Sequence, residues 1–214
     1  MDFSDLAGKT VIITGSGSGI GAAAAVGFAK LGSNLVLIGR RANKLESTKA
    51  NCLAAGLQEK QVLLVPGDIN DETVRKKCVQ EAVDTFGRID VLINNAAVGL
   101  IKPMLEQTME DYDFQFNTNL RSLVALSYLA VPHIIETKGS IINISSVWST
   151  YVAPDGLFYC MTKAALDMFT KCFARSLGEK GVRVNSINPG PVRTEIISAS
   201  AGDKADEVGS IKLF

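Results

Sequence analysis

Tyr159 and Lys163, spaced four residues apart, are the side chains of this sequence best suited to acid–base chemistry. Residues four apart lie one turn from each other on the same helix face. An ammonium at that position lowers the pKa of a phenol and makes tyrosine a usable proton donor or acceptor near neutral pH. Such pairs also occur by chance on many helices. This one gains meaning from Ser146, thirteen residues upstream, and from a glycine-rich turn near the N-terminus.

That turn follows the strand-like run Val11–Thr14 and reads Gly15-Ser-Gly-Ser-Gly19-Ile-Gly21, before an alanine-rich helical segment. Glycines permit a tight turn in which backbone N–H groups approach a pyrophosphate at a helix N-terminus. The spacing is Gly-x-x-x-Gly-x-Gly, because isoleucine at position 20 breaks the general Gly-x-Gly-x-x-Gly pattern. A strand before it and a helix after it favour a dinucleotide site over a merely flexible turn.

The residues after the second expected strand indicate which dinucleotide would bind. NAD sites usually carry an acidic residue about 20 positions beyond the turn, bonded to the ribose 2′-OH. Here Gly39 is followed by Arg40 and Arg41, and no acid occurs before Glu46. An arginine can instead bind a 2′-phosphate through charge-assisted hydrogen bonds. We assign that role to Arg40 and interpret Arg41 as a solvated loop charge, so NADP(H) is favoured, with NAD(H) as the alternative.

Composition argues against several other classes of protein. With 47% hydrophobic and 21% charged residues, the 214-residue chain is suited to a buried core. Its 22 basic and 22 acidic residues give no general attraction to a nucleic acid. The four cysteines form no C-x-x-C pair, which favours reduced thiols in a cytoplasmic protein over a disulfide framework or a metal site. We expect no signal peptide, membrane span or peroxisomal address.

Short apolar runs alternate with helical patterns along the chain, which predicts an α/β fold. Near-continuous hydrophobicity suits strands buried on both faces of a parallel sheet. Repeated strand–helix units then give a doubly wound sheet, a Rossmann fold, with helices on both faces. The expected strands are 11–13, 34–38, 61–65, 89–93, 140–144 and 182–187, and the expected helices are 20–31, 42–55, 71–86, 108–136 and 156–179. Glycines such as Gly87 and Gly139 stand at the expected helix exits.

In combination, these motifs resemble those of the short-chain dehydrogenase/reductase family. The resemblance runs from about Gly8 to Thr194. The motifs that carry it are Thr14–Gly21, Gly67-Asp68-Ile69, Asn94-Asn95-Ala96-Ala97, Asn119, Ser146, Tyr159-x-x-x-Lys163 and Asn188-Pro189-Gly190-Pro191-Val192-x-Thr194. Ala97 stands where glycine is more usual in the family.

The resemblance implies a role for each catalytic candidate. Tyr159 would protonate the carbonyl oxygen during reduction, and Ser146 would orient that oxygen. Lys163 would hold the nicotinamide ribose and lower the tyrosine pKa. Asn119 would hold a water that links Lys163 to solvent. A purely structural interpretation stays open for two of these residues. Ser146 could serve solely as a cap for the next segment, and Asn119 could serve solely to satisfy a buried helix backbone.

The resemblance also implies binding residues for cofactor and substrate. The cofactor set is Gly15, Ser18, Gly19, Ile20, Gly21, Arg40, Asp68, Ile69, Asn95, Ala96, Tyr159, Lys163, Pro189, Val192 and Thr194. Substrate would contact Ser146, Trp148, Val152 and Tyr159, in a pocket made largely apolar by Val98, Leu100, Phe158 and Pro191. Lys102 is the basic residue close enough in sequence to change that expectation. An uncharged, mainly apolar carbonyl or alcohol is therefore favoured.

The C-terminal part departs from the family pattern, in which a further helix and a seventh strand usually follow Thr194. We expect residues 1–197 to form a single dinucleotide-binding and catalytic domain. Residues 198–214 would be a flexible tail or a remnant of the substrate lid. Without a seventh strand the edge at 182–187 would be unpaired. The long helices at 108–136 and 156–179 would still support a homodimer, while the usual tetramer is in doubt.

Two functions remain in competition at this point. The leading hypothesis is an NADP(H)-dependent oxidoreductase that interconverts a carbonyl and a secondary alcohol. The alternative is a protein that binds the cofactor but acts as a partner or regulatory subunit, because of its shortened C-terminus. The complete set of catalytic candidates favours the enzyme, although a fold alone never establishes a function.

Overall fold

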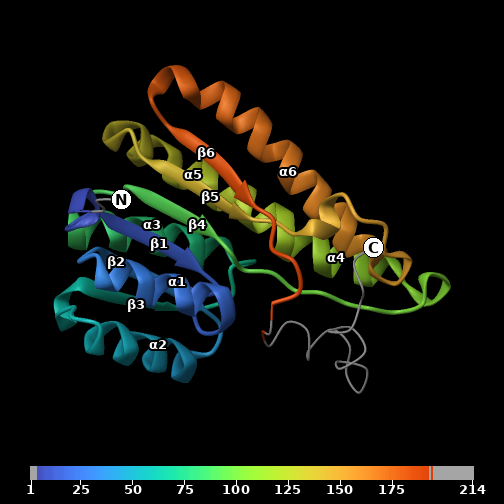
Figure 1. The fold of residues 1–214 in the computed structure, drawn as a ribbon, viewed down its shortest axis with the longest axis horizontal. Helices are drawn as coiled ribbons and strands as arrows, with labels where there is room; N and C mark the ends of the chain where they lie inside the picture. The colour runs from blue at the N-terminus through green and yellow to red at the C-terminus, as the bar shows by residue number, and fades with distance from the viewer. Residues whose placement is uncertain (1–3, 193, 195–214) are drawn as a thin grey trace.

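A sheet of six parallel strands organises the residues described by the computed structural model, which are 4–192 and 194. The spatial order is β3-β2-β1-β4-β5-β6 (Figure 1). The strands are β1 (Thr10–Thr14), β2 (Asn34–Gly39), β3 (Val62–Pro66), β4 (Val91–Asn94), β5 (Ser140–Ile144) and β6 (Arg183–Ile187). The chain first adds β2 and β3 on one side of β1 and then adds β4, β5 and β6 on the other side. This change in strand order opens a crevice at the carboxyl ends of β1 and β4. The predicted doubly wound Rossmann fold is confirmed.

Helices cover both faces of this sheet (Figure 1). On one face α1 (Gly19–Lys30) and α2 (Ala42–Ala54) pack against inward side chains such as Val11 and Ile13. On the other, α3 (Glu72–Phe86), α5 (Ser122–Thr137) and α6 (Leu157–Leu177) pack against a second set that includes Ile12. The two cores follow from strand geometry, because successive side chains point to opposite faces.

The long helix expected at 108–136 is divided into three parts. It consists of α4 (Met109–Phe116), a π-helical turn η4 (Asn117–Arg121) and α5. A π-turn places an extra residue in the turn and re-aims the side chains that follow, and such turns often lie at functional sites. Six short 3-10 helices complete the described elements: η1 (Ser4–Leu6), η2 (Glu59–Gln61), η3 (Met104–Glu106), η5 (Val147–Ser149), η6 (Pro154–Gly156) and η7 (Gly178–Lys180).

The exit of α5 also differs from the sequence-based expectation. The left-handed residue is Lys138, with φ of 50°, rather than Gly139. Gly139 is required for another reason, since a β-carbon there would collide with the carbonyl oxygen of Asp90. That oxygen accepts the N–H of Ser140 at 2.8 Å, so the glycine lets β5 enter the sheet beside β4.

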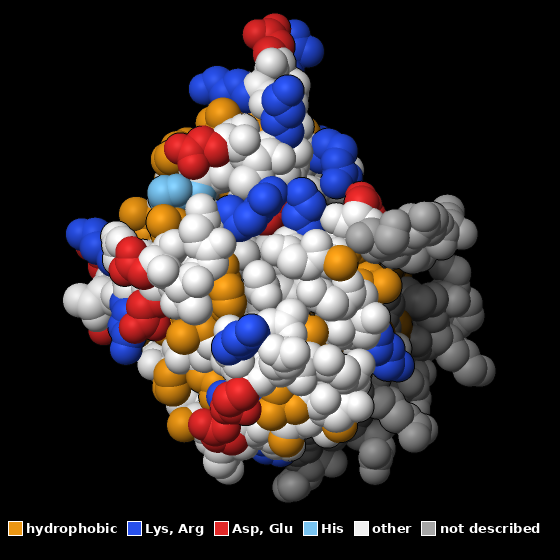
Figure 2. Space-filling model, turned by 90° about the vertical axis from the view of Figure 1, so that its left-hand side faces the viewer, with side chains coloured by type: hydrophobic (Ala, Val, Ile, Leu, Met, Phe, Trp, Pro, Cys, Tyr) orange, Lys and Arg blue, Asp and Glu red, His pale blue; other side chains and the backbone are white. Residues whose placement is uncertain are grey.

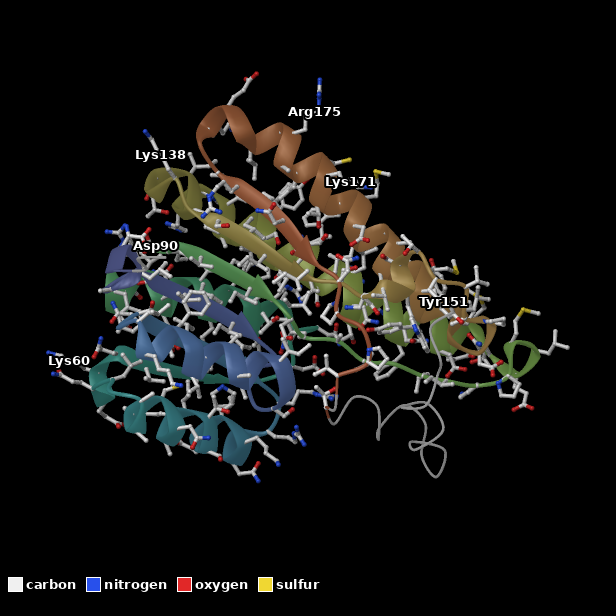
Figure 3. The ribbon with its side chains drawn as sticks, viewed as in Figure 1. Lys60, Asp90, Lys138, Tyr151, Lys171 and Arg175 are labelled. Atoms are coloured by element: carbon white, nitrogen blue, oxygen red, sulfur yellow. The ribbon has the colours of Figure 1, made fainter. Side chains whose placement is uncertain are left out.

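Asp90 joins three segments at the amino ends of the central strands, far from Tyr151 in Figure 3. Its carboxylate accepts the backbone N–H of Thr10 at 2.9 Å and two bonds from the Arg88 guanidinium at 2.6 and 2.8 Å. The Lys9 ammonium lies 3.5 Å from Oδ1 of the same carboxylate. Burial raises the pKa of this carboxyl, but the bonds from Arg88 and Thr10 outweigh burial and hold it below its ordinary value. Figure 2 views this end of the molecule, where basic and acidic side chains lie side by side.

Residues 198–214, expected to be a tail or lid remnant, lie outside the described residues. Among the helices that the structure describes, none is both long and apolar enough to cross a membrane.

Replacement of Asp90 by asparagine should remove a pH-dependent part of the stability. We expect Asp90→Asn to lower the free energy of unfolding at neutral pH by about 1–2 kcal/mol, because Arg88 and Lys9 lose their partner. A carboxyl with a lowered folded pKa stabilises above its unfolded pKa and loses that contribution as pH falls. Urea unfolding should therefore show a difference between variant and parent that narrows in acid. A constant difference between about pH 7 and pH 3 would contradict this explanation.

Candidate active site

A cavity of about 600 Å³ lies at the carboxyl ends of the strands, where loops after all six of them meet. Its wall contains most of the predicted binding residues, namely Gly15, Ser18, Gly19, Ile20, Arg40, Asp68, Ile69, Asn95, Ala96, Ser146, Trp148, Tyr159, Lys163, Pro189, Val192 and Thr194. Segments far apart in the sequence thus contribute to one space. Gly21, Asn119 and Val152, also predicted, are not part of that wall among the described residues.

The glycine-rich turn lies along one side of the cavity and is held by Thr14 and Asn95. Gly15 and Gly19 have positive φ angles of 64° and 54°, which favour glycine. The buried Thr14 hydroxyl accepts the N–H groups of Asn95 and Ala96 at 2.8 and 2.9 Å. In return the Asn95 amide donates to the carbonyls of Thr14 and Gly15. The loop after β4 therefore fixes the shape of the turn after β1.

Gly21 supports the turn from below rather than facing the cavity. A β-carbon on it would lie 2.5 Å from the Gly15 carbonyl oxygen and 2.6 Å from Nδ2 of Asn95. Glycine is thus needed here for close packing of the helix beneath the turn.

Arg41 is exposed, in agreement with its interpretation as a solvated loop charge, but it also has a partner in the glycine-rich turn. Its guanidinium donates to the Ser18 hydroxyl at 3.2 Å, so it reaches the glycine-rich turn. Arg40 and Arg41 both line the cavity. The sequence placed two arginines after β2, but only the folded turn shows that the second one bridges to it.

Ser146, Tyr159 and Lys163 meet on the opposite side of the cavity. Ser146 caps η5 by accepting the N–H of Trp148 at 3.1 Å, and its side chain also hydrogen-bonds to Tyr159. The capping interpretation is therefore confirmed, and the functional one stays a prediction. The Lys163 ammonium donates to the Ile144 carbonyl at 2.8 Å and lies 5.4 Å from the centre of the Tyr159 ring. The expected Tyr–Lys–Ser juxtaposition is present.

The protonation of this group differs in one respect from the expectation. Burial raises the pKa of Tyr159 to about 12, and its bond with Ser146 lowers it only in part. Burial also lowers the pKa of Lys163 to about 8, although the negative charge of Asp167 acts in the opposite direction and raises it. The lowering of the tyrosine pKa that was expected from Lys163 is therefore not found, because desolvation dominates and Ser146 is the group that lowers this pKa. At neutral pH the phenol carries its proton, as a proton donor must.

Asn119 lies in the π-turn η4 and is fully buried. Its side-chain oxygen accepts the N–H of Val98 at 2.7 Å, and its amide donates to the Val98 carbonyl at 2.8 Å and the Thr162 hydroxyl at 3.2 Å. The side chain therefore joins the loop after β4 to η4 and α6. The structural role expected from the sequence was to satisfy a buried helix backbone, but the backbone that Asn119 bonds belongs to the loop residue Val98. The water relay stays a prediction.

The expected substrate wall is only partly assembled. Trp148 packs edge-to-face on Tyr159 with 5.8 Å between ring centres, and a β-carbon on Gly156 would lie 2.5 Å from its indole. Val98, Leu100 and Pro191 line the cavity, together with Ile101 and Phe114, which the sequence did not single out. Val152 is 82% exposed, and Phe158 packs instead against Tyr112.

Lys102 is removed from the substrate wall by an ion pair. Its ammonium contacts both carboxylate oxygens of Asp111 at 2.8 Å, at the start of α4. The question that the sequence left open about a basic group in the pocket is thus answered for this residue. The substrate part of the cavity combines apolar walls with the hydroxyls of Ser146 and Tyr159.

Gly21→Ala should destabilise the fold, and Gly27→Ala on the same helix provides a matched control. The added methyl at position 21 meets backbone and side-chain atoms, which predicts a loss of about 1–3 kcal/mol in unfolding free energy. A β-carbon at Gly27 meets nothing within 4 Å. That variant should be neutral or up to about 1 kcal/mol more stable, because alanine favours the helix. Equal unfolding midpoints in urea for the two variants would show that the turn is not closely packed.

Comparison with known proteins agrees with this geometry. A family model described as short chain dehydrogenase matches residues 9–205. Human L-xylulose reductase is 35% identical over 200 residues, which cover 92% of this chain and 78% of that protein. The uncharacterised oxidoreductase YhdF of Bacillus subtilis is 38% identical over 198 residues, with 91% and 67% covered.

A solved structure supports the same assignment at the level of the fold. A short-chain dehydrogenase/reductase of unknown function from Caenorhabditis elegans, crystallised with cofactor, is 36% identical. It superposes with a TM-score of 0.89 over 94% of this chain and 77% of its own. The chain belongs to the short-chain dehydrogenase/reductase family of oxidoreductases.

Proposed function

We propose that the chain is an NADP(H)-dependent oxidoreductase that interconverts a carbonyl and a secondary alcohol on an uncharged, mainly apolar substrate. The observation that carries this proposal is the meeting of Ser146, Tyr159 and Lys163 in the wall of a cavity beside a glycine-rich turn. A proton donor, a group to orient the substrate oxygen and a cation are thus close to a nucleotide-sized space.

The residues present fit a nicotinamide dinucleotide. Gly15 and Gly19 let the backbone of the turn lie close to other residues of the cavity wall, since a β-carbon on Gly15 would lie 3.0 Å from the Ala96 Cα and one on Gly19 2.9 Å from Thr194. The N-terminus of α1 begins at the same turn and favours an anionic pyrophosphate. Asp68 and Ile69 would flank the adenine, and Pro189, Val192 and Thr194 the carboxamide. Arg40 and Arg41 would hold a 2′-phosphate.

The proposed chemistry divides the reaction between the cofactor and the protein. When bound, the nicotinamide supplies the hydride for reduction. The Tyr159 hydroxyl donates its proton to the carbonyl oxygen, while Ser146 holds that oxygen by a hydrogen bond. The Lys163 ammonium stabilises the phenolate left on Tyr159 and binds the ribose hydroxyls. Oxidation of an alcohol runs these steps in reverse.

The substrate class rests on the cavity wall. Trp148, Leu100 and Pro191 present apolar surface, and Lys102 is held by Asp111, so a charged substrate would find no partner in these residues. One relative is an L-xylulose reductase, which makes an uncharged hydroxyketone the polar alternative. A panel of apolar dicarbonyls, quinones and L-xylulose separates the two.

We further propose that the enzyme acts as a cytoplasmic homodimer. Tyr128 on α5 and Met168 on α6 are 64% and 58% exposed, although both are large and apolar. Two adjacent helices that present such residues suit a symmetric contact between copies of the chain.

Tyr159→Phe tests the proposed acid. Loss of the hydroxyl should lower kcat for carbonyl reduction by about 100-fold to 10,000-fold, the usual contribution of a general acid. NADPH binding, followed by nicotinamide fluorescence, should change little because the ring stays in place. Tyr128→Phe removes a hydroxyl from an exposed tyrosine and should retain full activity. Reduction at the parental rate by the Tyr159 variant would refute the mechanism, and binding without turnover in the parent would favour a non-catalytic protein.

Arg40→Ala and Arg41→Ala test the choice of cofactor. Each should weaken NADPH binding by about tenfold, since a charge-assisted bond to phosphate contributes about 1.5–3 kcal/mol. NADH affinity should be unchanged, because NADH lacks the 2′-phosphate. Arg175→Ala, on the outer side of α6, is the control. Equal losses for both dinucleotides would show that the arginines only stabilise the loop.

A further inference from the structure

One side-chain amide joins three elements of the candidate site. Nδ2 of Asn188, directly after β6, donates to the carbonyl oxygen of Ser146 at 3.1 Å. It also contacts the Ser149 hydroxyl at 3.0 Å and Oδ2 of Asp167 at 2.9 Å. These partners belong to the loop after β5, to η5 and to α6. Asn188 therefore connects the catalytic serine, the helix of Tyr159 and Lys163, and the segment that leads to Pro189.

Asp167 occupies the next turn of α6 after Lys163. Its Oδ2 accepts the Asn188 bond, whereas Oδ1 is buried without a hydrogen-bond partner in the described structure. A carboxylate oxygen buried without a hydrogen-bond partner costs free energy unless a nearby positive charge compensates the negative one. Lys163 is 1% exposed, and the Asp167 carboxylate is the charge that favours its ammonium form against burial. The anion thus balances a buried cation one helical turn away.

We infer that Asp167 and Asn188 form a positioning pair for the catalytic residues, in which Asn188 fixes the Asp167 carboxylate of α6 to the segment after β6 and Asp167 supplies a negative charge one helical turn from Lys163. The inference rests on the proposed function, because it assigns Lys163 a role as a cation. Neither residue lines the cavity, so both act through neighbours that do.

The surroundings of Lys163 leave Asp167 as its anionic neighbour. On α6 the other titratable neighbours are Tyr159 and Cys160, and the Cys160 thiol points to the carbonyls of Tyr151 and Ala153. β5 offers the uncharged carbonyl of Ile144, and the loop after it the hydroxyl of Ser146. The segment after β6 contributes Asn188. Lys171 and Arg175, further along α6, are exposed (Figure 3).

Titration of Lys163 tests the electrostatic half of the pair without cofactor or turnover. The ammonium can be followed by NMR in protein carrying isotope-labelled lysine, with Lys163→Arg to assign the signal. In Asp167→Asn the midpoint should move to lower pH, because the charge that favours the ammonium is lost while an acceptor for Asn188 remains. Asp167→Glu should restore the midpoint toward that of the parent. Glu179→Gln, which removes an exposed charge beyond the same helix, should leave it unchanged.

The result that would overturn this half is an unchanged midpoint in Asp167→Asn, or a Glu variant that shifts as far as the Asn variant. Circular dichroism confirms folding first, and Asp167→Ser replaces the Asn variant if that one does not fold. Because the titration requires no reaction, failure of the proposed function appears separately, as an absence of turnover in the parent protein.

Asn188→Ala tests the positioning half. We expect kcat to fall about tenfold while the Kd for NADPH changes less than about twofold, since small misplacements of catalytic groups reduce rate more than binding. The alkaline limb of kcat should also move to lower pH, as it should in Asp167→Asn, because a displaced carboxylate no longer favours the Lys163 ammonium. Ser149→Ala, which removes only one of the three acceptors, serves as the control. Parental kcat and pH profile in Asn188→Ala would overturn the inference.

Discussion

The burial of the Lys163 ammonium is the constraint on which the rest of the site depends. A cation in the interior must be balanced by dipoles and charges, or it loses its proton. The carbonyl of Ile144, the face of the Tyr159 ring and the carboxylate of Asp167 supply that balance from β5 and α6. Each of these groups is fixed in turn, so the position of α6 against the sheet and the state of the lysine are set together.

The other side of the cavity is organised by neutral hydrogen bonds. Thr14 and Asn95 exchange bonds between the ends of β1 and β4, and Asn119 pairs with Val98 in the manner of a short strand. Loops in a protein usually vary more than the strands they connect. Here buried side-chain amides replace strand pairing exactly where the strands end, which extends the order of the sheet into the walls of the cavity.

The sequence predicted the parts of the molecule that depend on local pattern. Apolar runs such as 34–38 gave the strands almost to the residue, because a parallel sheet buries both faces. The glycine-rich turn and the Tyr159–Lys163 spacing are equally local, and both motifs lie in the cavity wall. Gly21 was recognised from the motif, although its role is packing beneath the turn.

What the sequence missed depends on contacts between distant segments. The π-turn at Asn117–Arg121 leaves no pattern that differs from a continuous helix. Arg41 gains its partner only when β2 and the turn after β1 are adjacent. The family resemblance assigned Val152 to the pocket, but its side chain is exposed in the structure. The raised pKa of Tyr159 required a measure of burial, which spacing alone does not give.

Asp90 and Lys163 stand at opposite ends of the same parallel strands, and each limits the protein in a different way. Acid protonates the carboxylate that joins β1 to β4 and so weakens the fold. Alkali removes the proton of the Lys163 ammonium next to Tyr159, so the site would lose its cation while the fold persists. On the proposed function, the pH range of activity would therefore be bounded by unfolding on one side and by loss of the Lys163 charge on the other. Activity lost in alkali should return at once on neutralisation, whereas activity lost in acid must wait for the chain to refold.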